Sequence, residues 1–237
     1  MWWAGKRASA RTAIAYAGER AVRLSLGGAL LVAVDVEGRE AALAALAAGI
    51  RELPHGTPLR VTVSGAVCRP FLLPEVAGVT EAADWLAIAA SMVEDRAGLP
   101  PGSPVWLDGG QASPRMAVAI DAAWHHALVA LGGRSLASVR PWWALAIEST
   151  STGNAATATG LAVADSDELV LLIADGDTYR VAQTYPLDGE SASAVLNRAL
   201  VTHDVPAGGI ELIEFDADAL PGQQVDAALP FRKEVQA

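Results

Sequence analysis

The stretch TAIAYAGERAVRLSLGGALLVAV, residues 12–34, decides the fold. Thr12–Tyr16 and Ala21–Leu26 alternate in polarity, which is typical of half-buried strands. Ala29–Val34 is a third short apolar run, and glycine lies in the turn on each side of Ala21–Leu26. The stretch therefore predicts three consecutive β-strands joined by hairpin turns.

The same pattern occurs twice in the chain. An amphipathic helix over Arg39–Leu53 and a strand over Leu59–Ser64 follow the first three strands. In the second half we expect three strands, a helix and a strand in the same order, at Gly160–Val163, Leu169–Ala174, Tyr179–Thr184, Ser191–Thr202 and Ile210–Phe215. Two βββαβ units predict an α/β protein made of two similar lobes. The uninterrupted apolar run in Leu169–Ala174 is typical of a central strand.

Other segments divide the chain into regions. Between the two units we expect a helix, a buried strand and a second helix, at Glu81–Arg96, Met116–Ile120 and Ala122–Leu131. Residues 149–159 are rich in Ser, Thr and small residues, which is typical of a joint. The expected regions are a first lobe with an inter-lobe helix and strand, a shorter second lobe, and a peripheral tail, over residues 10–148, 157–217 and 218–237 respectively.

Composition and charge narrow the range of functions. The chain has 237 residues, 52% of them apolar, and a formal net charge of -10. Nucleic acid is not expected as a partner, because phosphate binding needs a basic surface. The single cysteine, Cys68, cannot form an internal disulfide and fits a reducing compartment. No apolar run reaches the ~18 residues of a membrane span and no secretory signal pattern is present, so we expect a cytoplasmic protein.

Patterns for metal binding and nucleophilic catalysis are weak. The four histidines, His55, His125, His126 and His203, do not lie at metal-ligand spacing from one another or from Cys68. Ser64-Gly65 closes a strand but lacks the Gly-x-Ser-x-Gly motif of a nucleophile elbow. We therefore expect no metal site, while paired carboxylates stay open because sequence does not reveal spatial pairs.

Several segments carry a family resemblance. Leu59–Ser64 leads into Phe71–Pro74, and Ala117–Ile120 with its helix leads into Leu136–Pro141. In these segments the chain resembles the actin-like cytoplasmic proteins of type IV pilus and type II secretion assembly, those called PilM and GspL. The resemblance implies two ribonuclease-H-like (actin-like) lobes, reduced relative to full actin-like ATPases. It also implies a scaffold or adaptor peripheral to the inner membrane, which docks a membrane-anchored, PilN-like partner.

The turns that would hold a nucleotide depart from the actin-like pattern. Actin-like ATPases bind phosphates with backbone amides of two hairpin loops of the form Asp-x-Gly. Here the first turn contains Gly18 and Glu19, and the second contains Asp165, Ser166 and Asp167. Carboxylates at this position repel a triphosphate, so we expect no nucleotide cofactor and no enzymatic activity. A nucleotide-binding ATPase or kinase with diverged phosphate loops remains the alternative.

Two tryptophan doublets are candidates for partner binding, because tryptophan is enriched in binding hot spots. Trp2-Trp3 lies in a basic N-terminal stretch and could dock on a partner or a membrane interface, or could simply be part of a frayed terminus. If Trp142-Trp143 lies on a strand, one indole reaches a surface; the alternative is that both fill the gap between the lobes. A subunit that self-associates, as a homodimer, through sheet edges or these doublets is a further alternative.

Overall fold

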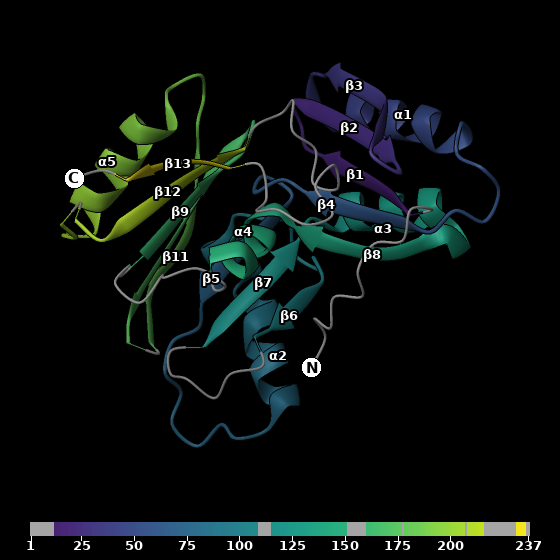
Figure 1. The fold of residues 1–237 in the computed structure, drawn as a ribbon. Helices are drawn as coiled ribbons and strands as arrows, with labels where there is room; N and C mark the ends of the chain where they lie inside the picture. Colours follow the sequence, from purple (N-terminus) through teal and green to yellow (C-terminus); the bar gives the residue numbers. More distant parts are fainter. Residues whose placement is uncertain are drawn as a thin grey trace.

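The computed structural model describes residues 12–108, 115–150, 160–176, 178–206, 208–215 and 231–235. This part of the chain forms a mixed α/β structure with two five-stranded sheets and one three-stranded sheet. Figure 1 shows the two larger sheets in separate halves of the molecule, with the smaller sheet below the first.

The first sheet contains the stretch that opens the chain. Its strand order is β3-β2-β1-β4-β8, and its strands are β1 (Ala13–Ala17), β2 (Ala21–Leu26), β3 (Ala29–Asp35), β4 (Leu59–Val63) and β8 (Leu136–Pro141). The first three pair antiparallel, whereas β1–β4 and β4–β8 pair in parallel. The predicted strands of this unit are confirmed to within a residue or two at each end.

Two helices cover one face of the first sheet. They are α1 (Gly38–Arg51) and α3 (Ala122–Gly132). Leu46 of α1 and Trp124 and Leu128 of α3 are buried in one core with Leu24 and Val61 of the sheet. The predicted helices are confirmed, and Asp121 caps α3 by accepting a hydrogen bond from the Trp124 amide at 2.9 Å.

The second sheet repeats the arrangement. Its order is β11-β10-β9-β12-β13, and its strands are β9 (Gly160–Ala164), β10 (Glu168–Asp175), β11 (Thr178–Pro186), β12 (Ile210–Phe215) and β13 (Phe231–Val235). The helix α5 (Ala192–Thr202) packs on this sheet through Val195, Leu196 and Ala199. As expected, β10 lies between two neighbours, and its first six residues are buried.

The described part of the tail is an edge strand of the second sheet. Within residues 218–237, the strand β13 pairs antiparallel with β12 and extends the second sheet. Three of its five residues are charged, so its composition gives no strand signal; backbone pairing with the exposed edge of β12 accounts for it.

The third sheet is an insertion between β4 and α3 that the sequence analysis did not separate from the first lobe. It has the order β5-β7-β6, with β5 (Cys68–Leu72), β6 (Val105–Leu107) and β7 (Met116–Ile120), and it packs against α2 (Ala82–Ser91). The predicted helix over Glu81–Arg96 is interrupted: α2 ends at Ser91, and a π-helical turn over Val93–Ala97 ends at Gly98, which adopts a φ of 61°. Strand β5 also lies beside β11 of the second sheet. The insertion therefore contacts both halves of the molecule.

Candidate functional site

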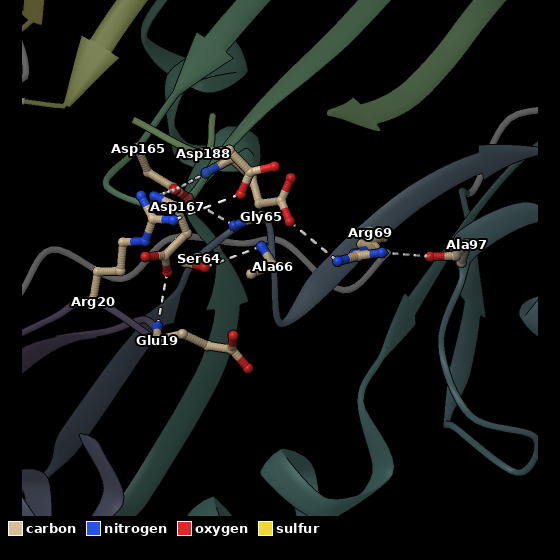
Figure 2. Close-up of polar contacts among 11 residues, drawn as sticks. Glu19, Arg20, Ser64, Gly65, Ala66, Arg69, Ala97, Asp165, Asp167 and Asp188 are labelled. Carbon is tan, nitrogen blue, oxygen red and sulfur yellow. Dashed lines mark hydrogen bonds and ion pairs between the residues drawn. The ribbon is translucent and has the colours of Figure 1, made fainter. Parts of the chain in front are cut away.

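The site lies where the turns of the two repeated units face each other. The β1–β2 turn contains Gly18 and Glu19, and the β9–β10 turn contains Asp165 and Asp167. Both turns follow the first strand of their sheet, so the repeated strand order positions them alike. Figure 2 shows the carboxylates of the second turn directed at backbone amides of the first half.

Asp167 joins the two turns directly. Its Oδ2 accepts a hydrogen bond from the Glu19 amide at 2.8 Å, across 148 residues of sequence. Gly18 permits this contact, because a Cβ added there would lie 2.4 Å from the same oxygen. Ser166 completes the contact through its hydroxyl, which is 3.2 Å from the Tyr16 hydroxyl.

Asp165 forms a second contact between the second turn and the first sheet. Its Oδ2 accepts a hydrogen bond from the Gly65 amide at 2.7 Å, at the turn that follows β4. Its Oδ1 accepts hydrogen bonds from the amides of Asp167 and Glu168 at 2.8 and 3.0 Å, which fixes the conformation of its own turn. One buried carboxylate thus orders the second turn and ties it to the first sheet.

A third contact is an ion pair between the insertion and the second sheet. Glu168 Oε1 accepts a hydrogen bond from Arg69 Nη2 at 3.2 Å, and Arg69 Nη1 donates to the carbonyl of Ala97 at 3.1 Å. The second carboxylate oxygen of Glu168, Oε2, is buried without a hydrogen-bond partner within the described residues. At the edge of the site, Arg20 and Asp188 lie 3.7 Å apart in solvent (Figure 2).

Burial sets the protonation of this cluster. Loss of solvent and the neighbouring Asp167 raise the pKa of Asp165 from 3.8 to about 7, although three backbone amides oppose the rise. Burial likewise raises the pKa of Glu168 from 4.5 to about 7, against the lowering effect of Arg69. Burial, together with Asp165 and Asp167, raises the pKa of Tyr16 well above its ordinary value. Near neutral pH the junction therefore holds both protonated and ionised carboxyl groups.

An open pocket of about 910 Å³ adjoins the first turn. Glu19, Arg20, Arg23, Asp35 and Glu37 are among its lining residues, so charges of both signs face it. In the part of the chain that the structure describes, no group of three or more His, Cys, Asp or Glu residues is placed to hold a metal ion.

The structure brings together all the turn residues that the sequence singled out: Gly18, Glu19, Asp165, Ser166 and Asp167. Sequence reasoning missed Tyr16, Gly65 and Arg69 as members of the site. The glycine after β4 was a detectable signal, because a backbone amide close to another chain segment often requires a glycine. A Cβ at Gly65 would lie 3.1 Å from Cβ of Glu168.

The second tryptophan doublet does not reach a surface. Trp142 and Trp143 begin the helix α4 (Trp142–Thr150) rather than lying on a strand, and they are 1% and 3% exposed. Trp142 packs edge-on against Tyr16 and Phe215, and Trp143 Nε1 donates a hydrogen bond to the Cys68 carbonyl at 2.9 Å. The doublet fills the core between the halves, which is the alternative that the sequence left open. Trp2 and Trp3 lie outside the described residues.

The repeated sheets and their facing turns define a protein of actin-like fold. A protein of actin-like ATPase fold and unknown function from Bacteroides thetaiotaomicron aligns with 86% of this chain and 81% of its own, at a TM-score of 0.54 and 10% sequence identity. The cytoplasmic domain of EpsL, an inner-membrane component of the type II secretion system of Vibrio cholerae, aligns with 77% of this chain and 74% of its own, at a TM-score of 0.49 and 11% identity. The first of these similarities establishes the fold alone. No family model and no curated protein sequence matches the chain.

None of the helices in the described ranges is both long and apolar enough to cross a bilayer.

Proposed function

We propose that this chain is a non-enzymatic scaffold of actin-like fold. In this proposal it is a cytoplasmic adaptor, peripheral to the inner membrane, that docks a membrane-anchored, PilN-like protein in a type IV pilus or type II secretion assembly platform. The assembly role rests on the sequence resemblance, and the fold of the Bacteroides protein is compatible with it. The absence of enzymatic activity rests on the geometry of the junction.

One observation carries the proposal: the chain places its own carboxyl groups on the amides of its turns. Asp167 occupies the Glu19 amide and Asp165 occupies the Gly65 amide. In an actin-like ATPase, phosphate oxygens accept hydrogen bonds from amides of the two hairpin turns. Here Asp167 occupies an amide of the first hairpin turn, and Asp165 also occupies the amides of Asp167 and Glu168 in the second. Here a phosphate would have to displace buried carboxylates and approach their charge, which opposes binding.

The two sheets support an arrangement of two ribonuclease-H-like lobes. In each, three antiparallel strands precede a helix and a strand that pairs in parallel with the first strand. The second lobe is the smaller, because it lacks the insertion that carries the third sheet in the first. Carboxylate contacts and the aromatic core hold these lobes together, as a rigid docking platform requires.

The docking role is tested by co-expression of the full chain with a bitopic, PilN-like protein of an assembly platform. We expect the two to co-purify from detergent-solubilised inner membranes, and the chain to remain in the soluble fraction when the partner is omitted. Recovery of the chain only in the soluble fraction in both cases contradicts the docking role.

The alternative function, a nucleotide-binding ATPase or kinase, is favoured by the open pocket beside the first turn, whose lining residues include Arg20 and Arg23. Titration of the purified chain with Mg·ATP at millimolar concentration distinguishes this alternative from the scaffold function. We expect no saturable heat in calorimetry and no rise in melting temperature. A saturable heat with matching stabilisation overturns the proposal, because a ligand that prefers the folded state must stabilise it.

A further inference from the structure

Strand β3 forms one edge of the first sheet, next to β2 (Figure 1). Every residue of β3 except Val32 is exposed. Leu30, Leu31 and Val34 are 48%, 43% and 39% exposed, which makes them the largest group of exposed apolar side chains on one described element. Open strand edges are commonly blocked by charged residues or proline, and the stretch from Ala29 to Val34 contains neither.

The adjoining helix is also uncharged over much of its length. Helix α1 packs against β2 and β3, and its residues Ala41, Ala44 and Ala48 are exposed. From Ala41 to Ile50 the helix has no charged residue. The exposed edge strand β3 therefore presents an uncharged surface from Ala29 to Val34 on a chain with a formal net charge of -10.

We propose that this surface, the exposed edge strand β3, is the interface between two copies of the chain. The proposal goes beyond the scaffold function and does not depend on whether the pocket binds a nucleotide. Two acidic copies repel each other at long range, so they meet most favourably where neither presents a charge. A partner of opposite charge would instead be drawn to the acidic remainder of the surface.

A two-fold symmetric contact through β3 also keeps the charged ends of the two strands away from each other. If two β3 strands run antiparallel about a point near Val32, the two Asp35 residues lie six positions apart along the ladder, about 20 Å at the usual rise per residue. Each Asp35 is already paired with Arg23 at 2.9 Å within its own subunit. Apolar residues then face apolar residues in the centre of the contact.

The β-bulge in β3 contributes to this surface. The pairing of β2 with β3 shifts between Leu24 and Ser25, which leaves Leu31 without an opposite residue. Leu30 and Leu31 on one side of Val32 are both exposed, and so are Ala33 and Val34 on the other, so both faces of β3 are open. The bulge lies in the pairing with β2, and the opposite edge of β3 has no neighbouring strand in its sheet.

The test is sedimentation equilibrium of the full chain at micromolar to millimolar concentration, in low and high salt. We expect a reversible dimer that tightens with salt, because salt screens the repulsion between the acidic copies and leaves apolar contacts intact. Leu31→Lys is expected to weaken the dimer at least ~10-fold, since a charge at the centre of the contact must be desolvated. Leu30→Lys serves as a second variant. Val201→Lys, at an 82% exposed position of α5, makes the same change of charge elsewhere and is expected to leave the dimer unchanged.

Circular dichroism and melting temperature verify that each variant is folded. If the wild-type chain stays monomeric at all concentrations, the proposal is overturned. Strand β3 is then left to a different protein partner. A dimer that Leu31→Lys and Leu30→Lys leave intact, or that Val201→Lys weakens equally, places the contact elsewhere and overturns it as well.

Discussion

Asp165 accepts more hydrogen bonds than any other side chain of the junction. It accepts from three backbone amides, one of them on the first sheet. Asp165→Ala leaves these donors without their acceptor, and we expect the free energy of unfolding to fall by about 3 kcal/mol. Urea denaturation measures the change. Asp188→Asn is the control, because this carboxylate is 72% exposed and its ion pair contributes little, and because asparagine tolerates the φ of 47° at this position; a loss below about 0.5 kcal/mol is expected. Equal losses in the two variants contradict the structural role of Asp165.

Glu168 makes the junction sensitive to pH. Its pKa in the folded chain is about 7, above its ordinary value of 4.5, so the folded state retains a proton that the unfolded state releases. The contribution of this group to stability is fully present below about pH 4.5 and is lost as the pH rises toward 7. Glu168→Gln keeps an acceptor for Arg69 and does not titrate. Relative to wild type, the variant is therefore expected to gain stability between pH 5 and pH 8, in the range of about 1–3 kcal/mol. Urea denaturation at several pH values measures this difference; a difference that does not change with pH contradicts the account.

At the scale of elements, helix α1 depends on a glycine for its approach to the sheet. A Cβ at Gly49 would lie 2.6 Å from Val32 Cγ2 and 2.7 Å from Leu24 Cδ2. Alanine favours the helix by about 1 kcal/mol, but the crowding costs 1–3 kcal/mol, so we expect Gly49→Ala to destabilise the chain by about 1 kcal/mol. Gly208→Ala is the control, since nothing lies within 4 Å of its added Cβ. Thermal unfolding compares them, and a stabilised Gly49→Ala variant contradicts the packing of α1.

The elements that could be predicted from sequence are those whose hydrophobic pattern follows from the burial of one of their own faces. The strands of both repeats, α1, α3 and α5 have clear periodicity because one face meets a core. The elements that departed from prediction depend on their neighbours. Trp142-Trp143 begins a helix because the indoles pack against Tyr16 and Phe215, and β13 exists through pairing with β12. Such contacts between distant segments leave no local signal.

At the scale of the whole molecule, an aromatic cluster joins the two halves. Trp142 is 1% exposed, and Tyr16 stacks on Phe215 with ring centroids 4.5 Å apart. Trp142→Ala opens a cavity between the sheets and is expected to lower the free energy of unfolding by 3–5 kcal/mol, on the order usual for a buried tryptophan. Trp106→Ala, at a 37% exposed tryptophan of the third sheet, should cost less than half as much. Denaturant unfolding followed by circular dichroism measures both, and comparable losses contradict the central position of Trp142.

The candidate site was predictable in part at this scale. The repeat placed two turns at equivalent positions, and their acidic residues indicated that a phosphate would be repelled. The carboxylates reach the amides of Glu19 and Gly65 because of the way the two halves pack together. The aromatic core sets this packing, and the sequence alone does not show it.

The central claim is that the chain's own carboxylates occupy the turn amides at which a phosphate would bind. The most direct test follows the amide resonances of Glu19 and Asp167, one in each hairpin turn, in the full ¹⁵N-labelled chain by NMR, with and without Mg·ATP at millimolar concentration. The account predicts that both amides exchange slowly with solvent and do not shift on addition of nucleotide. Saturable shifts of both amides with Mg·ATP would contradict it and establish the turns as a nucleotide site.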